Sequence, residues 1–176
     1  MIPSLATWAA AALALVLPAL VIVAAAKDLT SYTIPNWISL SVAGAFLPAA
    51  LAAGVAPPQL GLHLAIGLGA LLAGMALFAL RWIGGGDAKL LAAAALWLGW
   101  PALAPFLIAT VLTGGALSLA ILSLRAPLLR PLVLSGPAWF VRLAEPKEGV
   151  PYGVAIAVGA LTAFPASPFL TPLAAL

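Results

Sequence analysis

The sequence predicts an all-α, polytopic membrane protein with about six transmembrane helices and both termini on the extracytoplasmic side. Hydrophobic residues make up 65% of the 176 residues and charged residues only 6%. The mean hydropathy is +1.24. A soluble domain is about half apolar and a quarter charged. We therefore expect residues 1–176 to form a single integral-membrane domain with no soluble domain of appreciable size.

Breaks in the apolar pattern at charges, Pro and Gly delimit the expected helices. The predicted spans cover residues 4–26, 37–55, 60–82, 87–99, 102–124 and 151–173. The first lacks a basic leading segment and is too long for a signal peptide, so it is interpreted as a retained helix. The fourth span is short. Pro101 favours a tight turn between the fourth and fifth spans, with one bent helix as the alternative.

The positions of the cations predict the orientation. All seven Lys and Arg residues fall in the first, third and fifth loops. Cytoplasmic loops are enriched in Lys and Arg, so the odd-numbered loops are expected in the cytoplasm. The fifth loop, residues 125–150, mixes Arg with apolar residues and suits a segment lying on the membrane interface; a solvated linker is the alternative. Glu145, Lys147 and Glu148 in this loop are assigned no chemistry.

Composition also excludes several functions. The chain has no cysteine, which excludes disulfides, thiolate metal sites and a cysteine nucleophile. His63 is the single histidine, so a metal site is not expected and a serine mechanism lacks a good base. His63 itself is expected to be an interfacial or buried polar residue. The net charge of +3 follows the membrane pattern, and no nucleic-acid partner is expected.

Two aspartates occupy the predicted cytoplasmic edge of the membrane. Asp28 follows the first span and Asp87 opens the fourth, so the two can meet in space. Ionisable groups at membrane depth are costly and are functional candidates, although each could instead cap or flank a helix. Two close carboxylates hold one proton between them. The charged one can activate water while the protonated one donates to a scissile carbonyl, as in an aspartic protease.

The residues around Asp87 suit a peptide substrate. Gly84, Gly85 and Gly86 precede it, and a glycine-rich edge can hold an extended chain without side-chain clashes. A flexible loop is the alternative interpretation. Lys89 either marks the interface or favours the ionised form of Asp87.

The segment after Asp28 indicates a turn and a helix start. Ile34, Pro35 and Asn36 follow each other in "DLTSYTIPN". Pro35 fixes φ, and Asn36 is expected to act as the N-cap of the second span. The length of this segment sets the distance from Asp28 to the second span and so shapes one wall of a site.

Three ordered motifs resemble the type IV prepilin peptidases. "GGGDAKLLAAAALWLGW" is similar to the GxGD motif of that family and its following helix. "DLTSYTIPN" resembles the family's first catalytic motif, and "VPYGVAIAVGAL", residues 150–161, resembles the start of its last helix. The resemblance covers nearly the whole chain.

The resemblance implies an integral-membrane aspartic peptidase with Asp28 and Asp87 as the catalytic dyad. Gly84 and Gly86 would shape the backbone of the site. The family removes short, basic leaders, usually after a glycine, from prepilins or pseudopilins at the cytoplasmic side of the bacterial inner membrane. The apolar pilin helix stays in the lipid bilayer.

Further residues are placed around that site. Pro151, Tyr152 and Gly153 are expected to form a helix start that lines it, with an interfacial aromatic as the alternative. Family substrates carry a glutamate shortly after the cut. Lys89 or the basic fifth loop, for example Arg142, is hypothesised to orient it.

The chain also departs from larger family members. These have a cytoplasmic insert with paired cysteines, and many also methylate the new amino terminus with S-adenosylmethionine. Here the first loop is short and cysteine is absent. The chain therefore resembles the short branch associated with Flp (tight-adherence) pili. No cofactor is expected for proteolysis, and S-adenosylmethionine is expected only if the protein also methylates.

Two alternatives from other classes stay open. Paired intramembrane aspartates also serve proton-coupled transporters and channels, although no polar residues continue a path across the membrane here. A structural scaffold is favoured by small residues at helical spacing, such as Ala65, Gly69 and Ala73, but a scaffold leaves "GGGDAK" unexplained.

Overall fold

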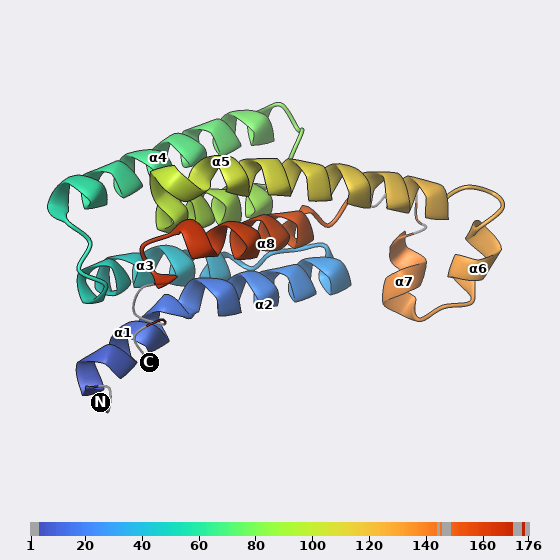
Figure 1. The fold of residues 1–176 in the computed structure, drawn as a ribbon. Helices are drawn as coiled ribbons and strands as arrows, with labels where there is room; N and C mark the ends of the chain where they lie inside the picture. Colours follow the sequence, from blue (N-terminus) through green and yellow to red (C-terminus); the bar gives the residue numbers. More distant parts are fainter. Residues whose placement is uncertain (1–3, 144, 146–148, 171–173, 175–176) are drawn as a thin grey trace.

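The described part of the chain is all helical, as the sequence predicts. The computed structural model describes residues 4–143, 145, 149–170 and 174, and these contain no strand. The helices are α1 (Leu5–Ala14), α2 (Val16–Ser31), α3 (Asn36–Ala52), α4 (Pro57–Ala79), α5 (Gly85–Leu124), α6 (Arg130–Leu134), α7 (Ala138–Leu143) and α8 (Tyr152–Ala163), followed by a 3-10 turn at Phe164–Ala166. Figure 1 shows the long helices lying side by side in a bundle.

Three described helical stretches are long and apolar enough to cross a membrane. They are Leu5–Ser31, Pro57–Ala79 and Gly85–Leu124. Asn36–Ala52 and Tyr152–Ala166 are apolar but shorter. The first stretch combines α1 and α2, which meet at Leu15. Pro18 follows closely and has no N–H to donate to the carbonyl of Ala14, which explains the interruption there.

Helix α5 reverses direction at Gly99, which has φ 66° and ψ −170°. Its first arm, residues 85–98, runs antiparallel to α4. Gly74 of α4 lies against Ala88, and Gly67 lies against Leu96. The sequence predicts a tight turn between the fourth and fifth spans, and the turn is present, two residues before Pro101.

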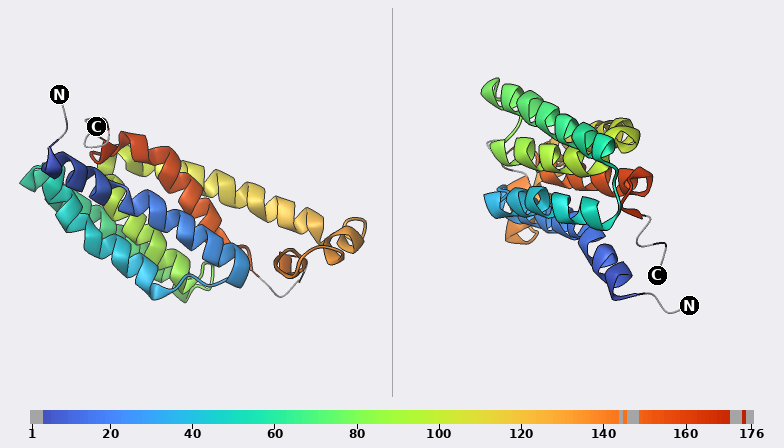
Figure 2. Two further views of the ribbon diagram at one scale, coloured as in Figure 1. Left: turned by 90° about the horizontal axis from the view of Figure 1, so that it is seen from below. Right: turned by 90° about the vertical axis from the view of Figure 1, so that its left-hand side faces the viewer.

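The second arm of α5, residues 100–124, returns along α8. Gly114 lies against the ring of Tyr152, and Gly159 of α8 lies against Thr110. Both ends of α5 therefore lie toward the same end of the bundle. The second arm extends beyond the other helices, and α6 and α7 lie at its far end (Figures 1 and 2).

His63 of α4 packs directly against the reversal. A Cβ on Gly99 would lie 2.6 Å from His63 Nε2, so a side chain at this position would collide with the imidazole. The His63 Nδ1–H donates to the carbonyl oxygen of Leu96 over 2.7 Å. In an unbroken helix that carbonyl would bond to residue 100, just beyond the turn. His63 is buried, which confirms the structural interpretation of this residue.

The aromatic core lies beside this turn. Trp97 is fully buried, and its Nε1–H donates to the carbonyl of Val42 over 2.7 Å. Its ring lies 4.6 Å from the ring of Phe169 and 6.2 Å from that of Phe46, measured between centroids. These contacts fix α3 and the first arm of α5 together and thereby set where the opposite, charged ends of the helices lie.

The expected interfacial loop forms the short helices α6 and α7. Leu128, which lies between α5 and α6, is 88% exposed. The Arg125 Nε–H donates to the carbonyl of Leu143, and the Arg142 guanidinium lies 5.0 Å from the ring centre of Tyr32. These contacts attach α7 to the ends of α5 and α2. Glu145 is exposed, whereas Lys147 and Glu148 lie outside the described residues.

Candidate active site

Asp28 lies in the last turns of α2 and is only 5% exposed. Its Oδ2 accepts a hydrogen bond from the backbone N–H of Gly153 over 2.7 Å. Gly153 is the second residue of α8, so the carboxylate lies at the positive end of that helix. Helix α2 ends just after Asp28, at Tyr32, which adopts a left-handed conformation with φ 53°. The carboxylate is thus held at a helix end by a donor from the far part of the chain.

Asp87 is the third residue of α5 and is partly buried. Its Oδ2 accepts from the N–H of Gly84 over 3.2 Å, which caps the helix from its own first turn. Its Oδ1 is buried and has no hydrogen-bond partner within the described residues. Buried polar atoms are normally satisfied, so this oxygen is suited to binding a water or a substrate group.

Ile34 joins the two aspartate-bearing elements. A Cβ on Gly86 would lie 3.0 Å from Ile34 Cβ, and a Cβ on Gly153 would lie 2.9 Å from Ile34 Cδ1. The segment between α2 and α3 therefore wedges between the starts of α5 and α8, and both helices use glycine to approach it. The neighbour of Asp87 and the hydrogen-bond donor to Asp28 therefore pack against the same residue.

The other two glycines of the triplet have different surroundings. A Cβ on Gly84 would lie 2.7 Å from Oδ2 of Asp87, so Gly84 leaves room for the cap. A Cβ on Gly85 would lie 3.3 Å from the exposed ring of Phe78, which can move aside. The tightest backbone constraint of the three is at Gly86, where the carbonyl oxygen of Ile34 would also lie 3.3 Å from the added atom.

The expected N-cap at Asn36 is wrong. Pro35 occupies the N-cap position, with φ −59° and ψ 138°, and Asn36 is the first residue of α3. The Asn36 side chain accepts a hydrogen bond from Lys89 Nζ over 2.9 Å instead of capping its own helix. Pro35 has an extended conformation compatible with its ring, and the amide of Asn36 is recruited by the neighbouring lysine.

Lys89 does not contact Asp87. Residues two apart on an α-helix project about 200° apart, so the two side chains leave α5 on different sides. Lys89 is directed to Asn36. Tyr152 packs its ring on Gly114 in the interface between α8 and α5.

Two contributions to the site were not identified from sequence. One is the wedge formed by Ile34, and the other is the backbone N–H of Gly153 as the donor to Asp28. The glycines that face Ile34 are the signal that could have indicated the wedge. Within the described ranges no three His, Cys, Asp or Glu side chains are grouped so that they could hold a metal ion.

The fold and site define an apolar, all-helical protein with a pair of carboxylates at one end of its bundle. Comparison with protein families gives a match over residues 15–119, more than half of the chain, to the type IV leader peptidase family. The chain therefore belongs to the type IV leader peptidase family, a family of peptidases. The match includes both aspartates and ends before Gly153. Comparison with curated proteins and with solved structures gave no match.

Proposed function

We propose that this protein is a membrane-embedded aspartic endopeptidase that removes the leader peptide from prepilins or pseudopilins. The observation that supports the proposal is the junction of α2, α5 and α8 around Ile34: Gly86, next to Asp87, and Gly153, the donor to Asp28, both pack against this residue. These aspartates come from segments far apart in sequence, and membership of the leader peptidase family supplies the reaction class.

The proposed reaction uses one charged and one protonated carboxyl group. The charged carboxylate takes a proton from water as its oxygen attacks the scissile carbonyl carbon, and the protonated partner donates to the carbonyl oxygen. Collapse of the tetrahedral intermediate breaks the C–N bond, and a proton goes to the leaving amine. Asp28 is oriented through Gly153, and the unpartnered Oδ1 of Asp87 is available to bind the water or the scissile carbonyl. Proteolysis by this route uses no cofactor.

The proposed substrates enter from the cytoplasmic face of the bacterial inner membrane. The site end of the bundle holds Lys27 beside Asp28, Arg81 before α5 and Arg125 after it, as expected for a cytoplasmic edge. The reversal of α5 supports two crossings by this helix and hence a six-span topology with both termini outside.

The substrate class and side reactions follow from the same resemblance. Residues 32–35 alone join α2 to α3, so no insert lies between them. This supports the short, Flp-associated branch, which acts on pilins with a basic leader and an apolar helix. We propose that methylation by S-adenosylmethionine does not accompany cleavage; mass spectrometry of the product amino terminus tests this.

The test is cleavage of a co-expressed candidate prepilin, followed by gel shift and mass spectrometry. Asp28→Asn and Asp87→Asn remove one carboxylate each without changing side-chain size. Each is expected to lower cleavage by at least about 1,000-fold, because a lone carboxyl cannot act as both base and acid.

Glu145→Gln is the matched control, because Glu145 is exposed and away from the bundle core. It is expected to cleave like the wild type. Membrane accumulation of each variant is measured in parallel. Full cleavage by either aspartate variant would contradict the dyad. Ion flux in proteoliposomes without cleavage would favour a transporter, and pilus assembly retained in the double Asn variant would favour a scaffold.

A further inference from the structure

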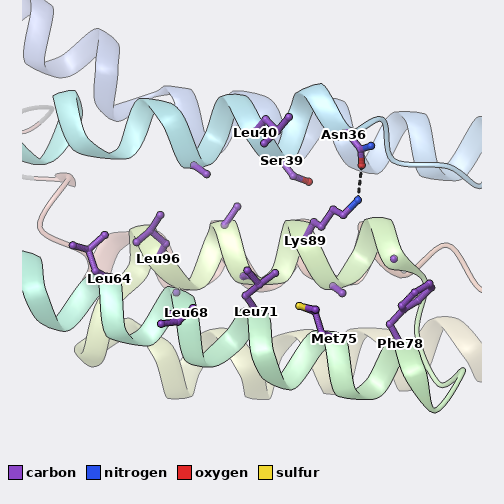
Figure 3. A pocket seen from close by; sticks show the side chains of 16 residues that line it. Asn36, Ser39, Leu40, Leu64, Leu68, Leu71, Met75, Phe78, Lys89 and Leu96 are labelled. Atoms are coloured by element: carbon purple, nitrogen blue, oxygen red, sulfur yellow. Dashed lines mark hydrogen bonds between the residues drawn. The ribbon is translucent and has the colours of Figure 1, made fainter.

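An apolar groove runs along the outside of the bundle between α3, α4 and the first arm of α5. Its volume is about 820 Å³. Figure 3 shows Leu68, Leu71 and Met75 of α4 on one side and Leu40 of α3 on the other. The floor is formed by small residues of α5, including Ala88 and Ala92. Such a floor allows another helix to approach closely.

One end of the groove is polar and lies at the site end of the bundle. It contains Asn36, Ser39 and Lys89 (Figure 3). Ser39 is only 6% exposed, and its hydroxyl has no hydrogen-bond partner among the described residues. A buried, unpartnered hydroxyl in an apolar groove indicates that a polar group of a ligand binds there.

The polar end carries uncompensated positive charge. Lys89 donates to the neutral amide of Asn36 and forms no ion pair within the described part of the chain. Helix α3 begins at this end, at Asn36, and a helix N-terminus carries partial positive charge. An anionic side chain is the group that Lys89 and this helix start favour.

The dimensions of the groove suit one face of a helix. It extends from Gly85 to Leu96 along α5 and from Leu64 to Phe78 along α4, which corresponds to about 17 to 21 Å. A helix of three to four turns therefore matches the groove in length.

We propose that this groove seats the apolar helix of the leader-bearing substrate, with an acidic side chain near the start of that helix bound by Lys89 and Ser39. The inference rests on the proposed peptidase function and adds the place where the substrate is held. The anionic group displaces Asn36 as the partner of Lys89 and satisfies the hydroxyl of Ser39.

The groove connects to the aspartates around the first turn of α5. Gly85 lines the groove, whereas Asp87 projects from the opposite side of the same turn. A chain leaving the groove passes Gly84 and Gly85, which present no side chains to obstruct it, whereas Gly86 is covered by Ile34. Crossing a helix diameter of about 10 Å takes about three extended residues. This length is compatible with a glutamate shortly after the cut, which the family resemblance implies.

The first experiment blocks the groove with a bulky side chain. Ala43 lines the groove from α3, while the next residue, Gly44, has no neighbouring heavy atom within 4 Å of an added Cβ. Ala43→Trp is compared with Gly44→Trp on two substrates: a prepilin with its apolar helix, and a peptide with the same leader and cut but no helix.

Ala43→Trp is expected to lower kcat/KM for the prepilin by at least about tenfold, which corresponds to the loss of about 1.4 kcal/mol of binding free energy. Gly44→Trp should cleave both substrates like the wild type, and the short peptide should not distinguish the two variants.

The second experiment exchanges charges. Lys89→Glu is expected to lower prepilin cleavage by about 10- to 100-fold, the range of a hydrogen bond to a charged group. Replacing the substrate acid by Lys should restore cleavage by Lys89→Glu. Lys27→Glu, at an exposed lysine of α2, should give no such rescue.

The third experiment identifies the occupant. A photo-crosslinking amino acid at Met75, in the non-cleaving Asp87→Asn background, is expected to crosslink to the apolar helix of the prepilin. Crosslinks to lipid alone, or equal prepilin cleavage by Ala43→Trp and Gly44→Trp, would overturn the groove assignment while leaving the peptidase function intact. Failure of the wild type to cleave either substrate would instead refute the proposed function.

Discussion

Gly153 contributes to the site through both its backbone and its missing side chain. Its N–H donates to Asp28, and a Cβ there would lie 2.9 Å from Oδ2 of the same carboxylate. Gly153→Ala should therefore displace Asp28 or Ile34 and misplace the dyad. We expect cleavage to fall by about 100-fold, as for a displacement of about 1 Å at a catalytic group.

Gly149→Ala is the control for that variant. Gly149 precedes α8, and an added Cβ would meet nothing within 4 Å. It should cleave at the wild-type rate. The prediction for Gly153 fails if both alanine variants have the same kcat/KM in the prepilin assay.

Side-chain chemistry was easier to predict at this scale than backbone chemistry. Asp28 and Asp87 stand out because carboxylates are rare in this apolar chain. The positions of the Lys and Arg residues alone predicted that both aspartates lie at the same edge of the membrane. The N–H of Gly153 has no such signature, since every residue but proline carries one. Asn36 was placed wrongly as an N-cap because its partner, Lys89, is distant in sequence and comes near only through folding.

At the scale of elements, the reversal of α5 is the feature on which the site depends. It brings the start of α5 to α8, and it is stabilised by Gly99 and His63. Gly99→Ala places a side chain in a backbone region that is nearly exclusive to glycine, at a cost of about 1 to 3 kcal/mol, and also drives it into the imidazole. We expect a lower Tm for the purified protein in detergent.

A double-mutant cycle separates the two causes. His63→Ala should also lower Tm, because the carbonyl of Leu96 loses its donor at a cost of about 1 to 3 kcal/mol. In the double variant the collision disappears while the backbone strain stays, so the loss should be smaller than the sum of the single losses. Gly69→Ala, where an added Cβ meets nothing, should leave Tm unchanged or raised. Strict additivity would contradict a direct contact between Gly99 and His63.

The ends of helices were predictable where the amino-acid composition changes along the chain, and less predictable where it stays apolar. The apolar runs gave α3 and α4 to within a few residues, because charges, Pro and Gly bound them. The turn at Gly99 was indicated by Pro101 and a short fourth span. The break between α1 and α2 was not predicted, since one proline in an apolar helix is compatible with a continuous span.

At the scale of the whole molecule, the order of the helices separates two chemically different ends. The charged end contains the end of α2 and the starts of α3, α5 and α8. The short helices α6 and α7 lie toward the same end (Figure 1). The aromatic cluster around Trp97 lies toward the other end, next to the turn of α5. Fixing the apolar end by packing leaves the glycine-rich charged end available for a substrate chain.

This polarity gives a prediction for the orientation in the membrane. The natural absence of cysteine allows single-cysteine labelling without a background. Three variants each carry one cysteine. Thr33→Cys places it between α2 and α3, Gly149→Cys places it before α8, and Ala56→Cys places it before α4, at the opposite end of the bundle. In cells with a permeabilised outer membrane, an impermeant maleimide should label Ala56→Cys, because the even loop faces outside. Thr33→Cys and Gly149→Cys should react only after the inner membrane is disrupted. The reverse pattern would place the aspartates outside the cytoplasm, where a peptidase acting before pilin export could not reach its substrate.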